Sequence, residues 1–303
     1  MSSSPRTALV IINPASRNGA EAELQNGWDT LQNAGIKLIH IESKSAEHTC
    51  EEIEKHERDV DFVILGGGDG TLSSAAKCLH KTGLPLAILP LGTANDLARS
   101  LSLPDDLEQA FQVIADDHRR TIDLGWVNGH YFFNVANIGL GVEITYELTP
   151  EVKKTWGVFS YLKALLAAIS RSHSFSITLL IDKKRYKSRS IHLGVGNGRF
   201  YGGGNVIDER CTIDNGRLSL FSLKPQSVWG LLTLAPLLRD GKQYQAQRTF
   251  TASGKQIEVF TRKPREIHAD GEPVSHTPAK FKVIPQALQV IAPAIDASQS
   301  HVI

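Results

Sequence analysis

The chain has 303 residues, a formal net charge of +1 and 21% charged residues. This length suggests two domains, and the near-zero charge gives no general attraction to nucleic acid. The three cysteines, Cys50, Cys78 and Cys211, form no CxxC pair, which argues against a disulfide framework or a cysteine zinc site and fits a reducing cytoplasm. The longest apolar block, 228–238, is shorter than the ~20 residues of a membrane span. We therefore expect a cytoplasmic protein whose membrane contact is peripheral.

The first 125 residues alternate between strand and helix signals. Buried strands are predicted at 8–14, 36–41, 61–67 and 84–90. Helices are predicted at 20–34, 49–56, 71–81, 94–101 and 106–115. Thr49 and Glu52 form a capping-box pattern at the start of the second helix. Such alternation predicts a parallel sheet covered by helices on both faces.

From about residue 120 the pattern becomes that of short strands joined by turns. Asn128-Gly129 is a strong two-residue hairpin signal. Further strands are predicted within 177–197, 216–223, 255–261, 266–270 and 279–284. Two helices, at about 155–170 and 228–239, interrupt them. This half of the chain is predicted to be mostly antiparallel sheet.

A glycine-rich loop follows the third predicted strand, in the stretch VILGGGDGTLSSA. It contains Gly66, Gly67, Gly68, Asp69, Gly70 and Thr71. Glycines allow a ligand to approach the backbone closely, and the N-terminus of the next helix favours an anion, most simply a phosphate. No Walker lysine or GxGxxG pattern is present. Because Asp69 would repel a phosphate directly, we interpret it as an acid linked through Mg²⁺; the alternative is that it caps a helix.

The next strand ends in a second loop of similar chemistry, LPLGTANDLARSL. Here Gly92, Thr93, Asn95 and Asp96 precede a helix. The ends of adjacent parallel strands meet at one edge of a sheet, so both loops are expected to serve one crevice. Capping by Thr93 is the alternative explanation.

Three further positions give weaker signals. Asn13, in NPASRNG after the first strand, could donate to a phosphate or ribose, although a bare turn explains it as well. Ser43 ends the second strand, where a ribose or phosphate contact would fall. In HADGEPV, Asp270-Gly271 ends a strand and exposes Glu272, which could also be an ordinary hairpin tip.

These motifs together resemble a known family. Residues 67–71 (GGDGT) are shared by phosphofructokinases, NAD kinases and lipid kinases. PLGTANDLAR narrows the resemblance to the diacylglycerol kinase catalytic family, and NGRFYGGG and DGE match its soluble bacterial members. The resemblance covers nearly the whole chain. It implies an α/β nucleotide-binding domain over 1–125 with a parallel sheet like that of NAD kinases and phosphofructokinases. A mostly antiparallel β-sandwich over 126–295, a tail over 296–303 and ATP in the cleft between the domains complete the implied fold.

The resemblance also implies roles for individual residues. The glycine loop and Thr71 would hold ATP phosphates, with Thr93 and Ser43 near the nucleotide. Glu272 would be the general base, and the acids associated with catalytic Mg²⁺ would be Asp69, Asp96 and Asp123. The choice of Asp123 comes from the resemblance alone.

One loop departs from the family pattern. Family members carry a structural Mg²⁺ on a loop written roughly LxxDGxL, whereas this chain has TIDNGRL, so Asn215 replaces the acid. If backbone carbonyls dominate the site, Thr212, Asn215 and Arg217 could still bind the metal, and Asp214 could substitute. Losing a carboxylate should weaken binding, because hard cations favour charged oxygen ligands.

The implied function is an ATP-dependent lipid kinase that phosphorylates a hydroxyl of diacylglycerol or a related glycerolipid or sphingolipid. Its expected partners are ATP, Mg²⁺ and a lipid at a membrane surface, with no nucleic acid; edge strands in the second domain leave a homodimer open. Residues 183–185 (KKR) could contact anionic headgroups or form a solvated hairpin tip. An NAD kinase would lack PLGTANDLA. A nucleotide-binding regulatory protein with a degenerate transferase site is the alternative from another class.

Overall fold

The computed structural model describes residues 6–16, 21–140, 142, 174–209, 211–226, 230, 233, 236–237 and 239–294. The chain divides into two compact units. The first unit comprises 1–124, 202–204 and 285–303, and the second comprises 125–201 and 205–284. The sequence placed one boundary at 125–126. In the structure, two segments from the second half of the sequence belong to the first unit: the loop 202–204 and the segment from residue 285, which contains the end of the last strand.

The first unit is built on a parallel sheet. Its strands, in spatial order, are β2 (Ile36–Glu42), β1 (Arg6–Ile12), β3 (Phe62–Gly67), β4 (Leu86–Pro90) and the end of β18 (Ala279–Ile291). All residues of β3 and β4 are buried, which is why they read as continuous apolar runs.

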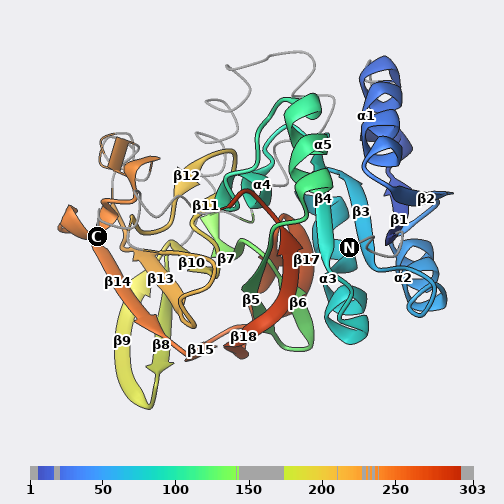
Figure 1. Ribbon diagram of the computed structural model, residues 1–303. Helices are drawn as coiled ribbons and strands as arrows, with labels where there is room; N and C mark the ends of the chain where they lie inside the picture. Colours follow the sequence, from blue (N-terminus) through green and yellow to red (C-terminus); the bar gives the residue numbers. More distant parts are fainter. Residues whose placement is uncertain are drawn as a thin grey trace. The chain divides into compact units, whose positions relative to one another are not determined.

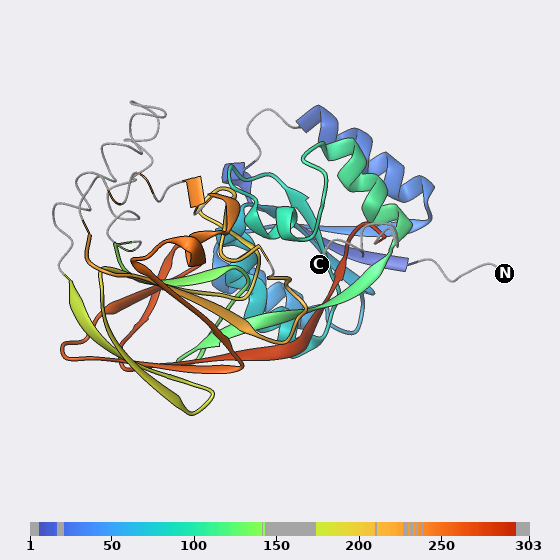
Figure 2. The same cartoon turned by 90° about the vertical axis from the view of Figure 1, so that its left-hand side faces the viewer.

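Helices pack against this sheet. Helices α1 (Glu21–Asn33) and α5 (Leu107–Asp116) lie side by side and share one apolar cluster with alternate residues of β1 and β3 (Figure 2). Helix α2 (Ala46–Lys55) contacts α3 (Asp69–Thr82), which contacts β3. The short α4 is Asp96–Ser100. The expected start of α2 at Thr49 is wrong: the N-cap is Ser45, which accepts the His48 N–H, and Thr49 is buried.

The second unit consists of two antiparallel sheets, which form the predicted β-sandwich. One runs from the first part of β18 through β15 (Gln256–Thr261) and β8 (Phe175–Ile181) to β9 (Lys184–Ser190) (Figure 1). The other has the order β14 (Thr249–Gly254), β13 (Leu218–Leu223), β10 (His192–Gly196), β7 (Val135–Gly139), β16 (Glu266–Ala269), β17 (Glu272–His276). Strand β5 (Arg119–Val127) turns through Asn128-Gly129 into β6 (His130–Phe132), as predicted. A small hairpin joins β11 (Phe200–Tyr201) to β12 (Asn205–Val206).

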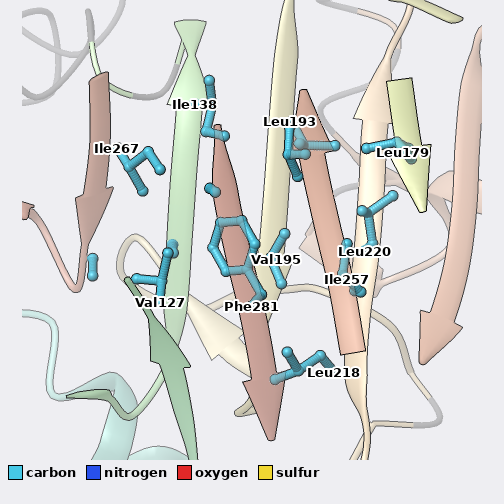
Figure 3. Close-up of a cluster of buried hydrophobic side chains, with 14 of the residues drawn as sticks. Val127, Ile138, Leu179, Leu193, Val195, Leu218, Leu220, Ile257, Ile267 and Phe281 are labelled. Atoms are coloured by element: carbon cyan, nitrogen blue, oxygen red, sulfur yellow. The ribbon is translucent and has the colours of Figure 1, made fainter. Parts of the chain in front are cut away.

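The core of the second unit lies between its two sheets. Figure 3 shows aliphatic side chains from both sheets meeting around Phe281, among them Leu179 and Ile257 from one sheet and Leu193 and Leu220 from the other. Period-two alternation explains the arrangement, because every second residue of each strand faces this core.

The sequence-based argument against a disulfide is wrong. Cys50 on α2 and Cys78 on α3 form a disulfide although the chain has no CxxC pair, because the packing of α2 on α3 brings them together. Cys211 is a buried free thiol. None of the helices in the described part of the chain has the length and apolar run that a bilayer crossing needs.

The two helices predicted in the second half lie mostly where the structure gives no description. The segment 155–170 is outside the described residues. Within 228–239, the described residues 230, 233, 236, 237 and 239 are helical.

Candidate functional site

The carboxyl ends of β1, β3 and β4 meet at one edge of the parallel sheet of the first unit. Asn13, just after β1, donates its backbone N–H to the Gly66 carbonyl at 2.9 Å. Leu91, just after β4, donates its backbone N–H to the Gly67 carbonyl at 3.2 Å. The loops that follow the three strands are therefore neighbours, and they lie at the edge where α/β sheets bind ligands. The sequence predicted this for the loops after β3 and β4.

Two of these loops approach each other so closely that glycine is required. A Cβ atom added at Gly92 would lie 2.4 Å from the Gly68 Cα, and one added at Gly68 would lie 3.2 Å from the Gly92 Cα. Gly67 is also constrained, because a Cβ there would meet the Thr71 side chain at 2.6 Å. The glycines thus bring the two predicted loops into direct contact.

The N-terminus of α3 lies within this arrangement and suits an anion. Its N-cap residue, Gly68, has no side chain to accept the first N–H groups of the helix. Thr71, in the first turn, accepts a hydrogen bond from the Asn13 side-chain amide at 3.1 Å. We call this arrangement of glycine backbone, helix N-terminus, hydroxyl and amide the cradle, and its chemistry is that of a phosphate-binding site.

Asp69 has a structural partner that the sequence did not identify. Its carboxylate accepts the backbone N–H groups of Asp96 at 3.1 Å and Leu97 at 3.0 Å. It therefore caps α4, the helix of the second loop, rather than the helix on which it lies. Asp69 is half-buried. This carboxylate fastens the two loops together and complements the positive end of α4.

Asp96 links the second loop to a third segment, residues 203–204. Its two carboxylate oxygens accept the backbone N–H groups of Gly203 (3.0 Å) and Gly204 (2.9 Å). The side chain is 4% exposed, and burial raises its pKa, with a smaller upward effect from Asp69 and opposing hydrogen bonds from the two glycines. The sequence showed the three consecutive glycines of YGGGN but gave no sign that they are bound to Asp96.

The other predicted nucleotide contacts of the first unit lie on the loops after β4 and β2. Asn95 uses its side chain on its own loop, accepting from the Gly92 N–H and donating to the carbonyls of Pro90 and Gly92. Thr93 is exposed. Ser43, at the end of β2, shares a 2.8 Å hydrogen bond with the Thr49 hydroxyl.

Asp123 is buried in β5, and its side chain binds the backbone of β18 at a residue with positive φ. Its carboxylate accepts the backbone N–H of Gln286 at 2.9 Å, and Gln286 has a φ of 50°.

In the described residues, no group of three or more histidine, cysteine or acidic side chains is arranged to hold a metal ion. A direct all-carboxylate cage therefore does not fit Asp69, Asp96 and Asp123. A water-mediated contact between these acids and Mg²⁺ stays a prediction.

In the second unit, Glu272 follows a tightly held turn. Asp270 and Gly271 have φ values of 47° and 95° and connect β16 to β17. The Asp270 carboxylate accepts three backbone N–H groups, from Phe133 (2.8 Å), Asn134 (2.9 Å) and Val135 (3.1 Å). Glu272, the first residue of the outermost strand, is exposed. The sequence drew attention to Glu272 and missed Asp270 as the group that fixes the turn.

In the loop predicted to hold a structural metal, the side chains of Asn215 and Arg217 make hydrogen bonds to protein groups. The Asn215 side-chain oxygen accepts the Arg217 backbone N–H at 3.0 Å. The Arg217 guanidinium binds the hydroxyl and carbonyl of Ser253 on β14 and lies 3.7 Å from Asp182. A metal role for Thr212, Asn215 and Arg217 stays a prediction.

Family models match both halves of the chain. A diacylglycerol kinase catalytic domain matches residues 7–127, and a YegS C-terminal NAD kinase beta sandwich-like domain matches residues 136–292. The chain belongs to the YegS-like lipid kinase family. A Pseudomonas syringae pv. syringae relative named "Probable lipid kinase YegS-like" is 36% identical over 291 residues, 93% of this chain and 90% of that protein. One of the same name from Stenotrophomonas maltophilia is 29% identical over 96% of this chain and 97% of its own length.

The fold of this YegS-like chain also occurs in a solved structure. A diacylglycerol kinase from Bacillus anthracis str. Sterne matches with a TM-score of 0.73 and 21% sequence identity, over 96% of this chain and 98% of the other. At this identity the match supports the shared fold alone. Together with the family models, it confirms the predicted combination of α/β unit and β-sandwich.

Proposed function

We propose that this chain transfers the γ-phosphate of ATP to a hydroxyl of a lipid such as diacylglycerol or a related glycerolipid or sphingolipid. The observation that carries the proposal is the cradle of the first unit. There, the uncapped N-terminus of α3 is lined by Gly67 and Gly68, with Thr71 and Asn13 beside it. This is the chemistry that binds nucleotide phosphates, and membership of a lipid kinase family supplies the class of acceptor.

In the proposed reaction, the lipid hydroxyl oxygen attacks the γ-phosphorus and forms the new O–P bond. The bond between that phosphorus and the β–γ bridging oxygen breaks, and ADP leaves. Glu272 accepts the hydroxyl proton. A magnesium ion bound with the nucleotide would offset charge on the transferring group, and Asp69 and Asp96 would hold it through water. Asp69 and Asp96 also keep the two loops and residues 203–204 in place through their backbone hydrogen bonds.

The decisive experiment incubates the full chain with γ-labelled ATP, Mg²⁺ and a panel of acceptors: diacylglycerol, phosphatidylglycerol, ceramide and NAD. Label in a lipid fraction is the expected result, and the lipid labelled fastest identifies the substrate. Label in NAD instead would identify an NAD kinase. ATP bound without transfer to any member of the panel would favour a nucleotide-binding regulator and contradict the proposal.

A further inference from the structure

The outer face of one sheet in the second unit is strongly basic. In the sheet β18–β15–β8–β9, residues such as Leu179, Ile257 and Phe281 face the core, so the residues that alternate with them face away from it. We call this outward surface the basic face. It is defined by Arg185, Lys187, Arg189, Lys280, Lys282 and Phe260.

The strand register brings these residues into rows across the sheet. Arg185 lies opposite Leu180 of β8, which lies opposite Glu258 of β15, which lies opposite Lys280 of β18. In the next row, Lys187 and Phe260 lie on either side of Thr178. Cations from the two ends of the sheet therefore share one face.

The charges on this face are not balanced by acids. Within the described residues, none of the five cations forms an ion pair. Two acids lie in their rows, Glu258 between Arg185 and Lys280, and Asp182, which donates its backbone N–H to Gln256 in the row of Lys282. Arg189 donates to the Ser174 hydroxyl, and the Lys282 ammonium lies 4.3 Å from the centre of the Trp126 ring. Since the chain as a whole has a net charge of +1, this face represents local segregation of positive charge.

An exposed aromatic side chain accompanies the cations. Phe260, in the row of Lys187, is 43% exposed, and it is one of three exposed large apolar side chains in the part of the chain that the structure describes. Charged residues on β9 alone could be explained as protection of an edge strand against pairing with another chain. That explanation does not cover Lys280 and Lys282, which lie on β18, away from the β9 edge, nor the exposed ring of Phe260.

We propose that the basic face docks on an anionic lipid bilayer. Cations near a bilayer are attracted to anionic headgroups, and an aromatic ring between them can enter the headgroup region. The choice of a bilayer over another polyanion rests on the proposed function, because a lipid kinase must reach an acceptor carried in a membrane. Of residues 183–185, whose role the sequence left open, Lys183 lies in the β8–β9 turn, and Lys184 and Arg185 are the first two residues of β9.

The test measures sedimentation of the full chain with vesicles in the absence of ATP. Vesicles of phosphatidylcholine with phosphatidylglycerol should bind it, and vesicles of phosphatidylcholine alone should bind it weakly. Each cation removed should reduce partitioning roughly 5-fold, so a variant with Arg185→Gln, Lys187→Gln and Lys280→Gln should bind about 100-fold more weakly. Added salt should release the wild-type protein.

A matched control removes three exposed cations from the first unit: Lys37→Gln, Arg58→Gln and Lys77→Gln. It has the same net charge as the basic-face variant and should retain binding. Equal loss in both variants, or equal binding of the wild-type protein to both vesicle types, would overturn the proposal. Displacement from phosphatidylglycerol vesicles by an equal charge of a single-stranded oligonucleotide would overturn it too, in favour of a nucleic acid partner.

A second measurement separates this proposal from the proposed kinase activity. Phosphorylation of a short-chain lipid dispersed in neutral detergent micelles should be the same in the wild-type protein and the basic-face variant, because no anionic bilayer is present. Vesicle binding without phosphorylation of any lipid would refute the kinase and leave the docking surface standing. Loss of micelle activity in the basic-face variant would contradict docking as the role of these cations.

Discussion

In both units, an aspartate carboxylate at a turn accepts backbone N–H groups, but only in the second unit does an exposed acid follow that turn. In the first unit, the carboxylates of Asp69 and Asp96 each accept two backbone N–H groups from another segment. In the second unit, Asp270 accepts three. There, however, the turn is followed by an acid, Glu272, that is exposed.

This difference shows why an acidic motif alone does not identify a catalytic acid. A carboxylate that binds backbone N–H groups fixes loop geometry, and its negative charge is partly satisfied where it lies. Asp69, Asp96 and Asp270 all do this. Glu272 is held in place by its neighbour Asp270 while its own side chain is exposed, which suits a group that must accept a proton from a substrate.

The largest expected effect comes from removing the carboxylate of Glu272, the proposed proton acceptor. Glu272→Gln should lower kcat roughly 10²–10⁴-fold, because general-base catalysis contributes on that order. Nucleotide affinity should be nearly unchanged, since the proposed phosphate cradle is built from other residues. Transfer of labelled phosphate and binding of a fluorescent ATP analogue measure the two quantities.

The control for this variant lies on the same hairpin. Glu266→Gln makes the same chemical change at a residue of β16 that is not proposed to contact substrate. It should remain within a few-fold of the wild-type rate. Normal turnover by Glu272→Gln would remove Glu272 from the mechanism.

The next effect in size concerns the residue that fixes the turn. Asp270→Ala leaves three backbone N–H groups without their acceptor and should lower the free energy of unfolding by about 2–4 kcal/mol. Asp270→Asn keeps one acceptor oxygen and should restore part of the stability and of kcat. Urea denaturation and steady-state kinetics measure both. Equal stability of Asp270→Ala and wild type would show that these hydrogen bonds do not hold the turn.

A smaller effect is expected where the two loops of the first unit touch. Gly92→Ala places a Cβ 2.4 Å from the Gly68 Cα, and overpacking of this kind costs about 1–3 kcal/mol. Gly70→Ala is the matched control for stability, because its Cβ would meet nothing within 4 Å and it lies in α3. It should be neutral or slightly stabilising in thermal denaturation. Equal melting temperatures for both variants would contradict the close contact of the loops.

The sequence could predict what local patterns determine. The apolar runs of β3 and β4 and the glycines after them identified the parallel sheet and the edge where the loops meet. The sequence could not predict which backbone N–H groups each carboxylate binds. Asp69 caps a helix that begins 27 residues further along the chain, and the glycines bound by Asp96 lie 107 and 108 residues after it. Only tertiary packing brings these groups together. The Cys50–Cys78 pair was missed for the same reason.

The smallest expected effect is a change of stability with pH that depends on Asp96. Burial raises the pKa of its carboxyl above the ordinary value of 3.8, so the folded state holds this proton more tightly than the unfolded state does. The contribution of Asp96 to stability is therefore full below pH 3.8 and is lost as the pH rises through the pKa of the folded state. Asp96→Asn cannot ionise and loses one acceptor at every pH, which adds a constant offset. Urea unfolding of both proteins between pH 3 and pH 8 should show the wild type losing stability relative to the variant as the pH rises. The opposite slope would mean that the N–H groups of Gly203 and Gly204 outweigh burial and that this carboxylate is stabilised in its charged form.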